Sequence, residues 1–279
     1  MAEILKAILF GIVEGITEWL PVSSTGHMIL LDEFVKLNVT PEFWEMFKVV
    51  IQLGAILAVI QLYWNTIWPL KRMKVRGGGT KIVWKKQTLL LWVKVIIACI
   101  PAAIVGIAFD DWLEAHLQNF IVVAVMLILV GIAFIVVENM QAGKTPTVTR
   151  LKDISYKDAI IIGVFQLIAA ILPGTSRSGA TIIGSLLLGI SRPVATKFTF
   201  ILAIPVMAGA SLLKILKHGL AFSGQELGIL AVGMIVAFVV SMVVIRMMVN
   251  YIRTHDFKVF GWYRIILGLL VLLYFGLLK

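Results

Sequence analysis

The chain has 279 residues, of which 60% are hydrophobic and 14% charged, and its mean hydropathy is +1.01. Because a soluble domain carries about 25% charged residues, this composition excludes an ordinary soluble protein and predicts an all-α integral membrane protein. The net charge of +10 does not indicate nucleic-acid binding, because the Lys and Arg residues cluster in loops between apolar stretches, where membrane topology and anionic lipids account for them.

The apolar stretches follow one another in a pattern that occurs twice. The first stretch, 5–37, is interrupted by Leu-Pro and a Ser/Thr/Gly cluster, and the second interrupted stretch is 156–190. Three uninterrupted stretches follow each of them, at about 43–63, 88–109 and 119–138, and at about 196–216, 226–249 and 259–278. At roughly 20 residues, each uninterrupted stretch is long enough to cross a bilayer, so six transmembrane helices are expected.

The two interrupted stretches are expected to be re-entrant helix–loop–helix hairpins. Proline breaks a helix, and small hydroxyl residues satisfy the freed backbone groups. Irregular backbone at membrane depth is tolerated where it is buried in protein or lines a cavity. Aligning Leu20-Pro21 with Leu172-Pro173 also brings Gly11 onto Gly163, which indicates an internal repeat.

Parity predicts how the two repeats are related. Three complete crossings separate the hairpins, which is an odd number, so the second repeat (151–279) is expected to be inverted relative to the first (1–150). Inverted repeats with broken helices place their site near the membrane midplane, where the two interruptions meet. The Lys- and Arg-rich loops 64–87 and 139–157 are expected in the cytoplasm, and the acidic loop 110–118 is expected outside.

The first hairpin carries candidate catalytic groups. Glu14 and Glu18 are spaced i, i+4 and share a helix face, and a carboxylate at membrane depth usually marks a site. The alternative is that this stretch lies at a wet surface. Two carboxylates this close repel each other, which is expected to raise the pKa of one of them and so to supply an acid–base pair. The hydroxyl and imidazole residues that follow are candidates for a nucleophile activated by an adjacent base: Ser23, Ser24, Thr25 and His27.

The second hairpin carries a candidate anion clamp. Arg177 lies between Ser176 and Ser178, and its planar guanidinium suits a phosphate or carboxylate. The alternative is that Arg177 forms an internal salt bridge to Glu14 or Glu18. The two interpretations are compatible, because the salt bridge can form when no substrate is bound. Thr175 adds a hydroxyl, and the helix that follows offers its N-terminus to an anion.

These groups together suit phosphoryl transfer, which needs a clamp, a nucleophile and a proton carrier. No cluster suits a transition metal, but Glu14 and Glu18 leave open a magnesium or calcium ion bridging to phosphate. Four other charged residues near span ends are expected to be interfacial anchors whose charged groups reach water: Lys94, Glu138, Lys197 and Arg264.

Two motifs carry a resemblance to a known family. Glu14-Gly-Ile-Thr-Glu18 with Pro21–His27, and Pro173–Thr181, resemble the bacterial undecaprenyl pyrophosphate phosphatases of the bacitracin-resistance type, over nearly the whole chain. The resemblance implies hydrolysis of undecaprenyl diphosphate, a polyprenyl diphosphate lipid, to undecaprenyl phosphate and inorganic phosphate. It implies a multi-pass protein of the bacterial inner membrane that recycles the lipid carrier for cell-wall synthesis and confers bacitracin resistance.

The resemblance also implies roles for the site residues. Arg177 would hold the diphosphate, with Ser23, Thr25, Thr175, Ser176 and Ser178 as further phosphate-binding residues. Ser24 or His27 would attack; we favour Ser24, with His27 as acid/base. Glu18 would activate the nucleophile, and Glu14 would position it or bind a cation. No tightly bound cofactor is expected, and a homodimer stays open.

The rival hypothesis is a lipid-carrier flippase or a secondary transporter of an anionic substrate. Inverted repeats with broken helices are typical of secondary transporters, and a midplane Arg can simply hold an anionic headgroup. The architecture favours this rival, whereas the Glu, Ser and His residues favour hydrolysis. Both activities can occur in one protein.

Overall fold

The computed structural model describes residues 1–74, 80–117, 119–219 and 221–277 of the chain. In the first half, its elements are α1 (Ala2–Thr17), α2 (Ser24–Phe34), α3 (Pro41–Val50), α4 (Gln52–Leu62), α5 (Trp64–Ile67), β1 (Leu70–Lys74), β2 (Thr80–Trp84), α6 (Lys86–Leu117) and α7 (Phe120–Gln141). After a 3-10 turn, η1 (Leu151–Asp153), the second half contains α8 (Tyr156–Ile171), α9 (Arg177–Leu187), α10 (Arg192–His218), α11 (Gly224–Tyr251) and α12 (Lys258–Leu277).

The prediction of six membrane spans is confirmed in the described part of the chain. Six helical segments are long and apolar enough to cross a membrane: Pro41–Leu62, Lys86–Phe109, Phe120–Gln141, Arg192–His218, Gly224–Tyr251 and Lys258–Gly276. The first of them joins α3 and α4. The protein is therefore a mostly helical, multi-pass membrane protein.

The helix ends follow local sequence signals. Thr40 caps α3, where its side chain accepts a hydrogen bond from the Phe43 amide and Pro41 occupies the first turn. Ser155 begins α8 with a capping box to Asp158, and α11 begins in the same way.

Two loops differ from the sequence prediction. Within 64–87, the described residues form α5 and the antiparallel strands β1 and β2, with Leu70 opposite Trp84; residues 75–79 lie outside the described residues. The expected loop 110–118 is instead helical through Leu117, because no Gly or Pro in this stretch ends α6. Residue 118, like 220 and 278–279 in the second expected repeat, lies outside the described residues.

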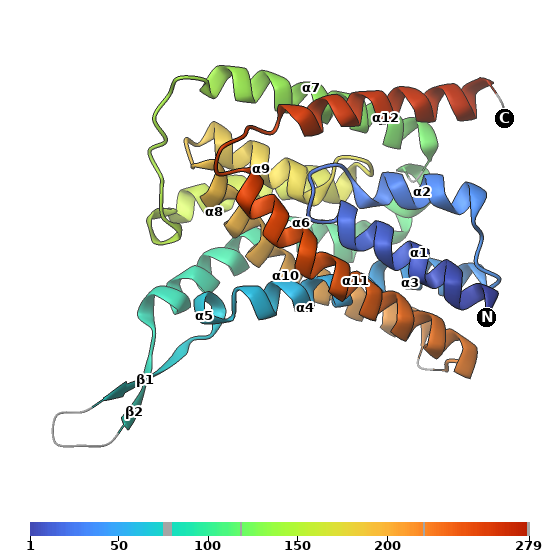
Figure 1. The fold of residues 1–279 in the computed structure, drawn as a ribbon, viewed down its shortest axis with the longest axis horizontal. Helices are drawn as coiled ribbons and strands as arrows, with labels where there is room; N and C mark the ends of the chain where they lie inside the picture. The colour runs from blue at the N-terminus through green and yellow to red at the C-terminus, as the bar shows by residue number, and fades with distance from the viewer. Residues whose placement is uncertain (75–79, 118, 220, 278–279) are drawn as a thin grey trace.

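The helices of the two halves pack reciprocally. The first helix of the first half, α1, packs on α11, and the first helix of the second half, α8, packs on α6. The last helices of the halves, α7 and α12, pack on each other. Both termini lie at one end of the molecule, and β1 and β2 project from the other end (Figure 1). In that view α1 and α2 lie toward the termini, and α8 lies toward the strands.

Close helix contacts depend on glycine. A Cβ atom added to Gly131 on α7 would lie 2.7 Å from the carbonyl oxygen of Gly261 on α12, and the reverse distance is also 2.7 Å. The contact of α4 with α11 is tighter still, because a Cβ atom at Gly54 would lie 2.0 Å from the Met234 carbonyl oxygen. Small residues at such crossings let membrane helices approach closely.

The Gly54→Ala substitution is therefore expected to destabilise the protein by about 1–3 kcal/mol, because α4 and α11 must move apart. Thermal unfolding in detergent measures this change. Gly106→Ala is the matched control: no described atom lies within 4 Å of a Cβ atom added there, so stability should be unchanged or slightly higher. Equal melting temperatures for Gly54→Ala and wild type would contradict the tight crossing.

Candidate active site

The two breaks in the helices have the same local geometry. Between α1 and α2, Ser23 has a φ of 72°, and its side chain accepts a hydrogen bond from the Gly26 amide at 3.3 Å. Between α8 and α9, Ser176 has a φ of 68°, and its side chain accepts one from the Gly179 amide at 3.2 Å. A non-glycine residue at such φ costs about 1–3 kcal/mol, and such strain clusters at functional sites. Each strained serine caps the helix that follows it.

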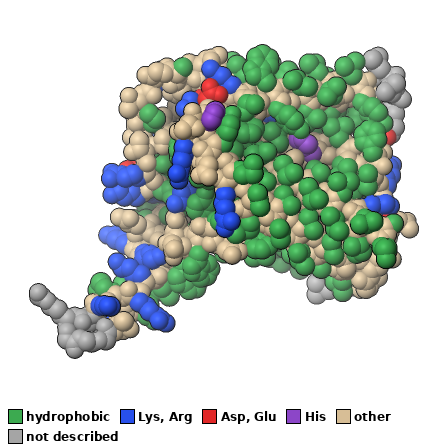
Figure 2. Space-filling view, in the orientation of Figure 1, with side chains coloured by type: hydrophobic (Ala, Val, Ile, Leu, Met, Phe, Trp, Pro, Cys, Tyr) green, Lys and Arg blue, Asp and Glu red, His purple; other side chains and the backbone are tan. Residues whose placement is uncertain are grey.

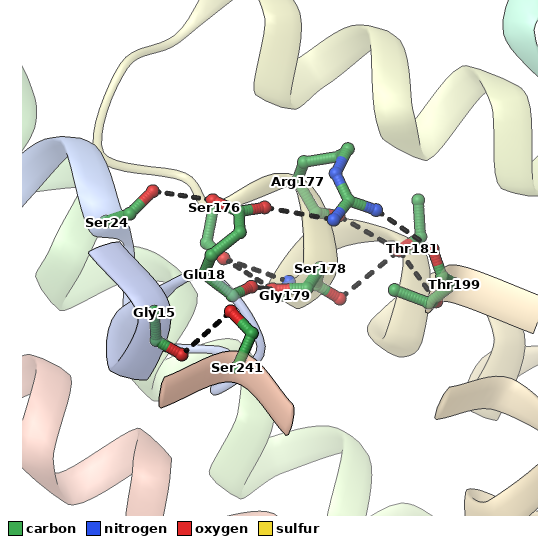
Figure 3. Close-up of polar contacts among 10 residues, drawn as sticks. All are labelled: Gly15, Glu18, Ser24, Ser176, Arg177, Ser178, Gly179, Thr181, Thr199 and Ser241. Carbon is green, nitrogen blue, oxygen red and sulfur yellow. Dashed lines mark hydrogen bonds and ion pairs between the residues drawn. The ribbon is translucent and has the colours of Figure 1, made fainter. Parts of the chain in front are cut away.

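The two loops meet through a buried ion pair. The Arg177 Nη2 atom lies 3.0 Å from Glu18 Oε1, and their side chains are 12% and 7% exposed. Ser24 donates a hydrogen bond to Glu18 Oε2 at 2.7 Å, so one carboxylate joins the hydroxyl and the guanidinium (Figure 3). The internal salt bridge considered for Arg177 is therefore present, with Glu18 as its partner. Arg177 also donates to the Thr199 carbonyl at 2.9 Å.

The remaining residues of the second loop lie close to this pair. Ser178 donates to the Glu18 carbonyl at 3.3 Å, and its hydroxyl lies 3.1 Å from that of Ser176. Thr175 is 1% exposed. Thr25 differs from the other predicted site residues, because it is exposed on α2.

Three buried polar atoms at the site have no hydrogen-bond partner among the described residues. They are Glu14 Oε1, Thr175 Oγ1 and Arg177 Nε. Glu14 is 1% exposed, which excludes the alternative of a wet surface position. Buried polar atoms are normally paired, so donors and an acceptor left over in one place indicate a site for a polar ligand.

His27 is hydrogen-bonded to groups other than the ion pair. Its Nδ1 atom lies 2.7 Å from the Ser23 carbonyl oxygen, which requires an N–H there. Its Nε2 atom therefore accepts from the Tyr263 hydroxyl, also at 2.7 Å, and the two rings stack at 5.7 Å between centroids. The structure thus separates the two candidate nucleophiles, because Ser24 is paired with Glu18 and His27 with Tyr263.

Arg264 was missed as a site residue. It is fully buried, so its expected place as an interfacial anchor is wrong. Its guanidinium donates to the Pro21 carbonyl of the first loop at 3.1 Å, and to the Gly174 and Thr175 carbonyls of the second loop at 2.7 and 3.0 Å. Its burial could have been inferred from its position in the span, because Arg264 lies nearly two turns inside α12, whereas Lys258 begins the helix.

Two of the other expected anchors are also buried. Glu138 is 1% exposed and binds Arg192 and the Phe257 amide. Lys94 is 7% exposed and donates to the Lys152 carbonyl at 3.0 Å. Both charged side chains bind partners inside the protein, and these partners come from segments distant in the sequence.

A metal ion would have few ligands here. No group of three or more His, Cys, Asp and Glu side chains that could hold a metal occurs among the described residues. Arg177 and Ser24 engage both oxygens of Glu18, whereas Glu14 keeps one oxygen without a partner. Glu14 is therefore the carboxylate that fits a hard cation best.

Sequence comparisons identify the family of the chain. Residues 7–270 match the family model described as bacitracin resistance protein BacA. The chain belongs to the BacA family. The matched range includes both loops of the BacA-family chain, and thus Glu18, Ser24 and Arg177.

Curated relatives are similar over almost their whole length. The undecaprenyl-diphosphatase of Desulfitobacterium hafniense is 60% identical over 99% of this chain and 97% of its own. That of Enterococcus faecalis is 58% identical over 97% of this chain and 96% of its own. Undecaprenyl-diphosphatase 1 of Clostridium acetobutylicum is 58% identical over 98% of this chain and 97% of its own.

The Arg264→Leu substitution is expected to destabilise the protein, because it leaves the three carbonyl oxygens of the two loops, and two more on α7, without this donor. The cost is about 1–3 kcal/mol for each unsatisfied oxygen. Unfolding in detergent measures it, with Arg253→Leu at an exposed position as the control. A stability equal to that of the control would show that Arg264 does not hold the loops.

Proposed function

We propose that this protein hydrolyses undecaprenyl diphosphate to undecaprenyl phosphate and inorganic phosphate. The name of the relatives, undecaprenyl-diphosphatase, supports this substrate. The observation that carries the chemistry is the connected set Ser24–Glu18–Arg177, in which a hydroxyl, a base and a cation meet at the contact of two loops.

Ser24 is the proposed nucleophile. Glu18 already accepts the hydrogen bond of its hydroxyl, so Glu18 takes the proton as the Ser24 oxygen attacks the terminal phosphorus. The bond to the bridging oxygen breaks, and undecaprenyl phosphate leaves. His27 relays the Ser24 proton from Glu18 to the leaving phosphate, which restores the Glu18 carboxylate. Glu18 then deprotonates a water molecule that attacks the phosphoserine, and the Ser24 oxygen takes this proton back as inorganic phosphate leaves. His27, oriented by Tyr263 and the Ser23 carbonyl, is the proposed acid/base for the leaving group.

Arg177 is the proposed phosphate clamp. Its Nε atom lacks a partner, and its Nη2 atom can exchange Glu18 for a phosphate oxygen. Thr175, whose hydroxyl is also unpartnered, and the N-terminus of α9 add donors. The other proposed phosphate-binding residues are Ser23, Thr25, Ser176 and Ser178.

A magnesium or calcium ion is a proposed addition to the site. Such an ion would neutralise charge on the diphosphate, and Glu14 has the oxygen to hold it. A homodimer stays a prediction, because one chain is described.

The re-entrant hairpins and the inverted repeat are part of the proposal. The reciprocal packing of α1 on α11 and of α8 on α6 supports two related halves, as do the matching strained serines. At 16 residues, α1 and α8 are each about 24 Å long, shorter than the roughly 30 Å of a bilayer core. In this arrangement Arg177 and Glu18 meet near the midplane of the bacterial inner membrane.

The same architecture supports the rival, a lipid flippase. Hydrolysis releases inorganic phosphate, whereas flipping moves the lipid without breaking a bond, so a phosphate assay separates them. In either case the proposed role is recycling of the lipid carrier for cell-wall synthesis, and the BacA family name is consistent with bacitracin resistance.

The decisive assay is phosphate release from undecaprenyl diphosphate by purified protein in detergent, with and without a chelator. Wild type is expected to release phosphate, and Ser24→Ala to lose about 100-fold or more in rate. Ser241→Ala is the matched control, because that hydroxyl donates to the Gly15 carbonyl at 3.5 Å rather than to Glu18 (Figure 3).

Each other outcome of this assay has a meaning. Wild-type protein that moves lipid across vesicles but releases no phosphate would replace the hydrolase with the flippase. Normal turnover by Ser24→Ala, with loss in His27→Ala, would transfer the nucleophile to His27. Activity lost to the chelator and restored by magnesium or calcium in wild type, but not in Glu14→Gln, would support the cation.

Arg177→Ala is expected to abolish activity, because it removes the clamp and leaves the Glu18 charge uncompensated. Arg177→Lys should keep the charge but lose the planar geometry, so an intermediate rate with a raised KM is expected. Near-normal turnover by Arg177→Ala would exclude Arg177 from the site.

A further inference from the structure

A separate basic cavity lies at the base of the β1–β2 hairpin. Its volume is about 710 Å³, and none of its lining residues belongs to the Ser24–Glu18–Arg177 set. Five lysines line it: Lys71, Lys85, Lys86, Lys94 and Lys152. None of its described lining residues is acidic. Figure 2 shows Lys and Arg side chains gathered over this end of the molecule.

Three separate segments build this cavity. Lys71 comes from β1, Lys152 from η1, and Lys86 and Lys94 from α6. The start of α6 is fixed to the α5 segment, because Thr88 donates to the Thr66 carbonyl at 3.1 Å. Positive-inside topology requires basic loops, but it does not require lysines of different loops to converge on one cavity.

Among the described residues, no carboxylate forms an ion pair with a lysine of this cavity. Lys85 donates to the Asn65 carbonyl at 3.0 Å, and Lys94 to that of Lys152, so both are held by neutral acceptors. Two carboxylates attract Lys94, but their hydrogen bonds go to other groups: Asp153 pairs with Arg150 at 2.6 Å, and Asp158 belongs to the capping box of α8. Five like charges repel one another, so an anion in the cavity would stabilise the arrangement.

The surroundings of the cavity have the character of a membrane interface. Trp64, Trp68 and Trp84 are 46%, 43% and 65% exposed, as expected for interfacial indoles. On the hairpin, Arg72 is paired with Ile82, so basic and apolar side chains share a face. Basic pockets at the cytoplasmic side of membrane helices bind lipid headgroups.

We infer that this cavity binds the phosphate headgroup of an anionic phospholipid of the cytoplasmic leaflet, with the acyl chains along α6. The lysines bind the phosphate oxygens, and Leu90, in the cavity wall and at the exposed face of α6, contacts the first acyl carbons. This inference does not depend on the proposed hydrolysis.

Native mass spectrometry of the full chain, released from detergent with phosphatidylglycerol or phosphatidylcholine, tests it. Phosphatidylglycerol is expected to stay bound, whereas phosphatidylcholine is not. The Lys71→Gln/Lys152→Gln double variant should bind phosphatidylglycerol about 30-fold more weakly, since each lysine near an anionic headgroup contributes about 1 kcal/mol. Both lysines are exposed, so folding should be preserved, and a melting temperature checks it.

The matched control is Lys144→Gln/Lys157→Gln, which removes the same charge from exposed positions outside the cavity. An equal loss of lipid in the control would reduce the effect to general surface charge and overturn the site. If inorganic phosphate without lipid raised the melting temperature as much as phosphatidylglycerol does, a lipid would be excluded as the specific ligand.

Discussion

The buried ion pair between Glu18 and Arg177 is the interaction on which the rest of the structure depends. A charge inside a membrane protein is costly unless an opposite charge and hydrogen bonds compensate it. Here each residue compensates the other, and Ser24 and the Thr199 carbonyl complete the set. The pair can form because two helical stretches are interrupted at the same place, and a strained serine begins the next helix after each interruption.

Much of the fold could be predicted because its signals are local. Long apolar runs identified the six spans, and Leu-Pro followed by small hydroxyl residues identified the breaks before Ser24 and Arg177. The β1–β2 hairpin could not be predicted in this way, since its strands are short and carry basic residues. The extension of α6 to Leu117 could not be predicted either, because acidic residues after an apolar run are equally typical of a loop.

The composition of the site was visible in the sequence, but its pairing was not. The candidate catalytic residues divide into two groups, one around Glu18 and one in which His27 is hydrogen-bonded to Tyr263. Tyr263 lies far from His27 along the chain, so no local pattern connects them. The burial of Arg264 is equally non-local, because the carbonyl groups that bind it come from both loops.

The reciprocal packing of the halves has a consequence for biosynthesis. Helix α1 is made first, yet its packing partner α11 begins at Gly224, near the end of translation. Until then, the face of α1 that meets Gly233 lacks its partner helix, and Glu18 lacks its ion-pair partner until Arg177 has been synthesised. A chain with such distant contacts completes its folding late, so α1 reaches its final packing only after α11 has been synthesised.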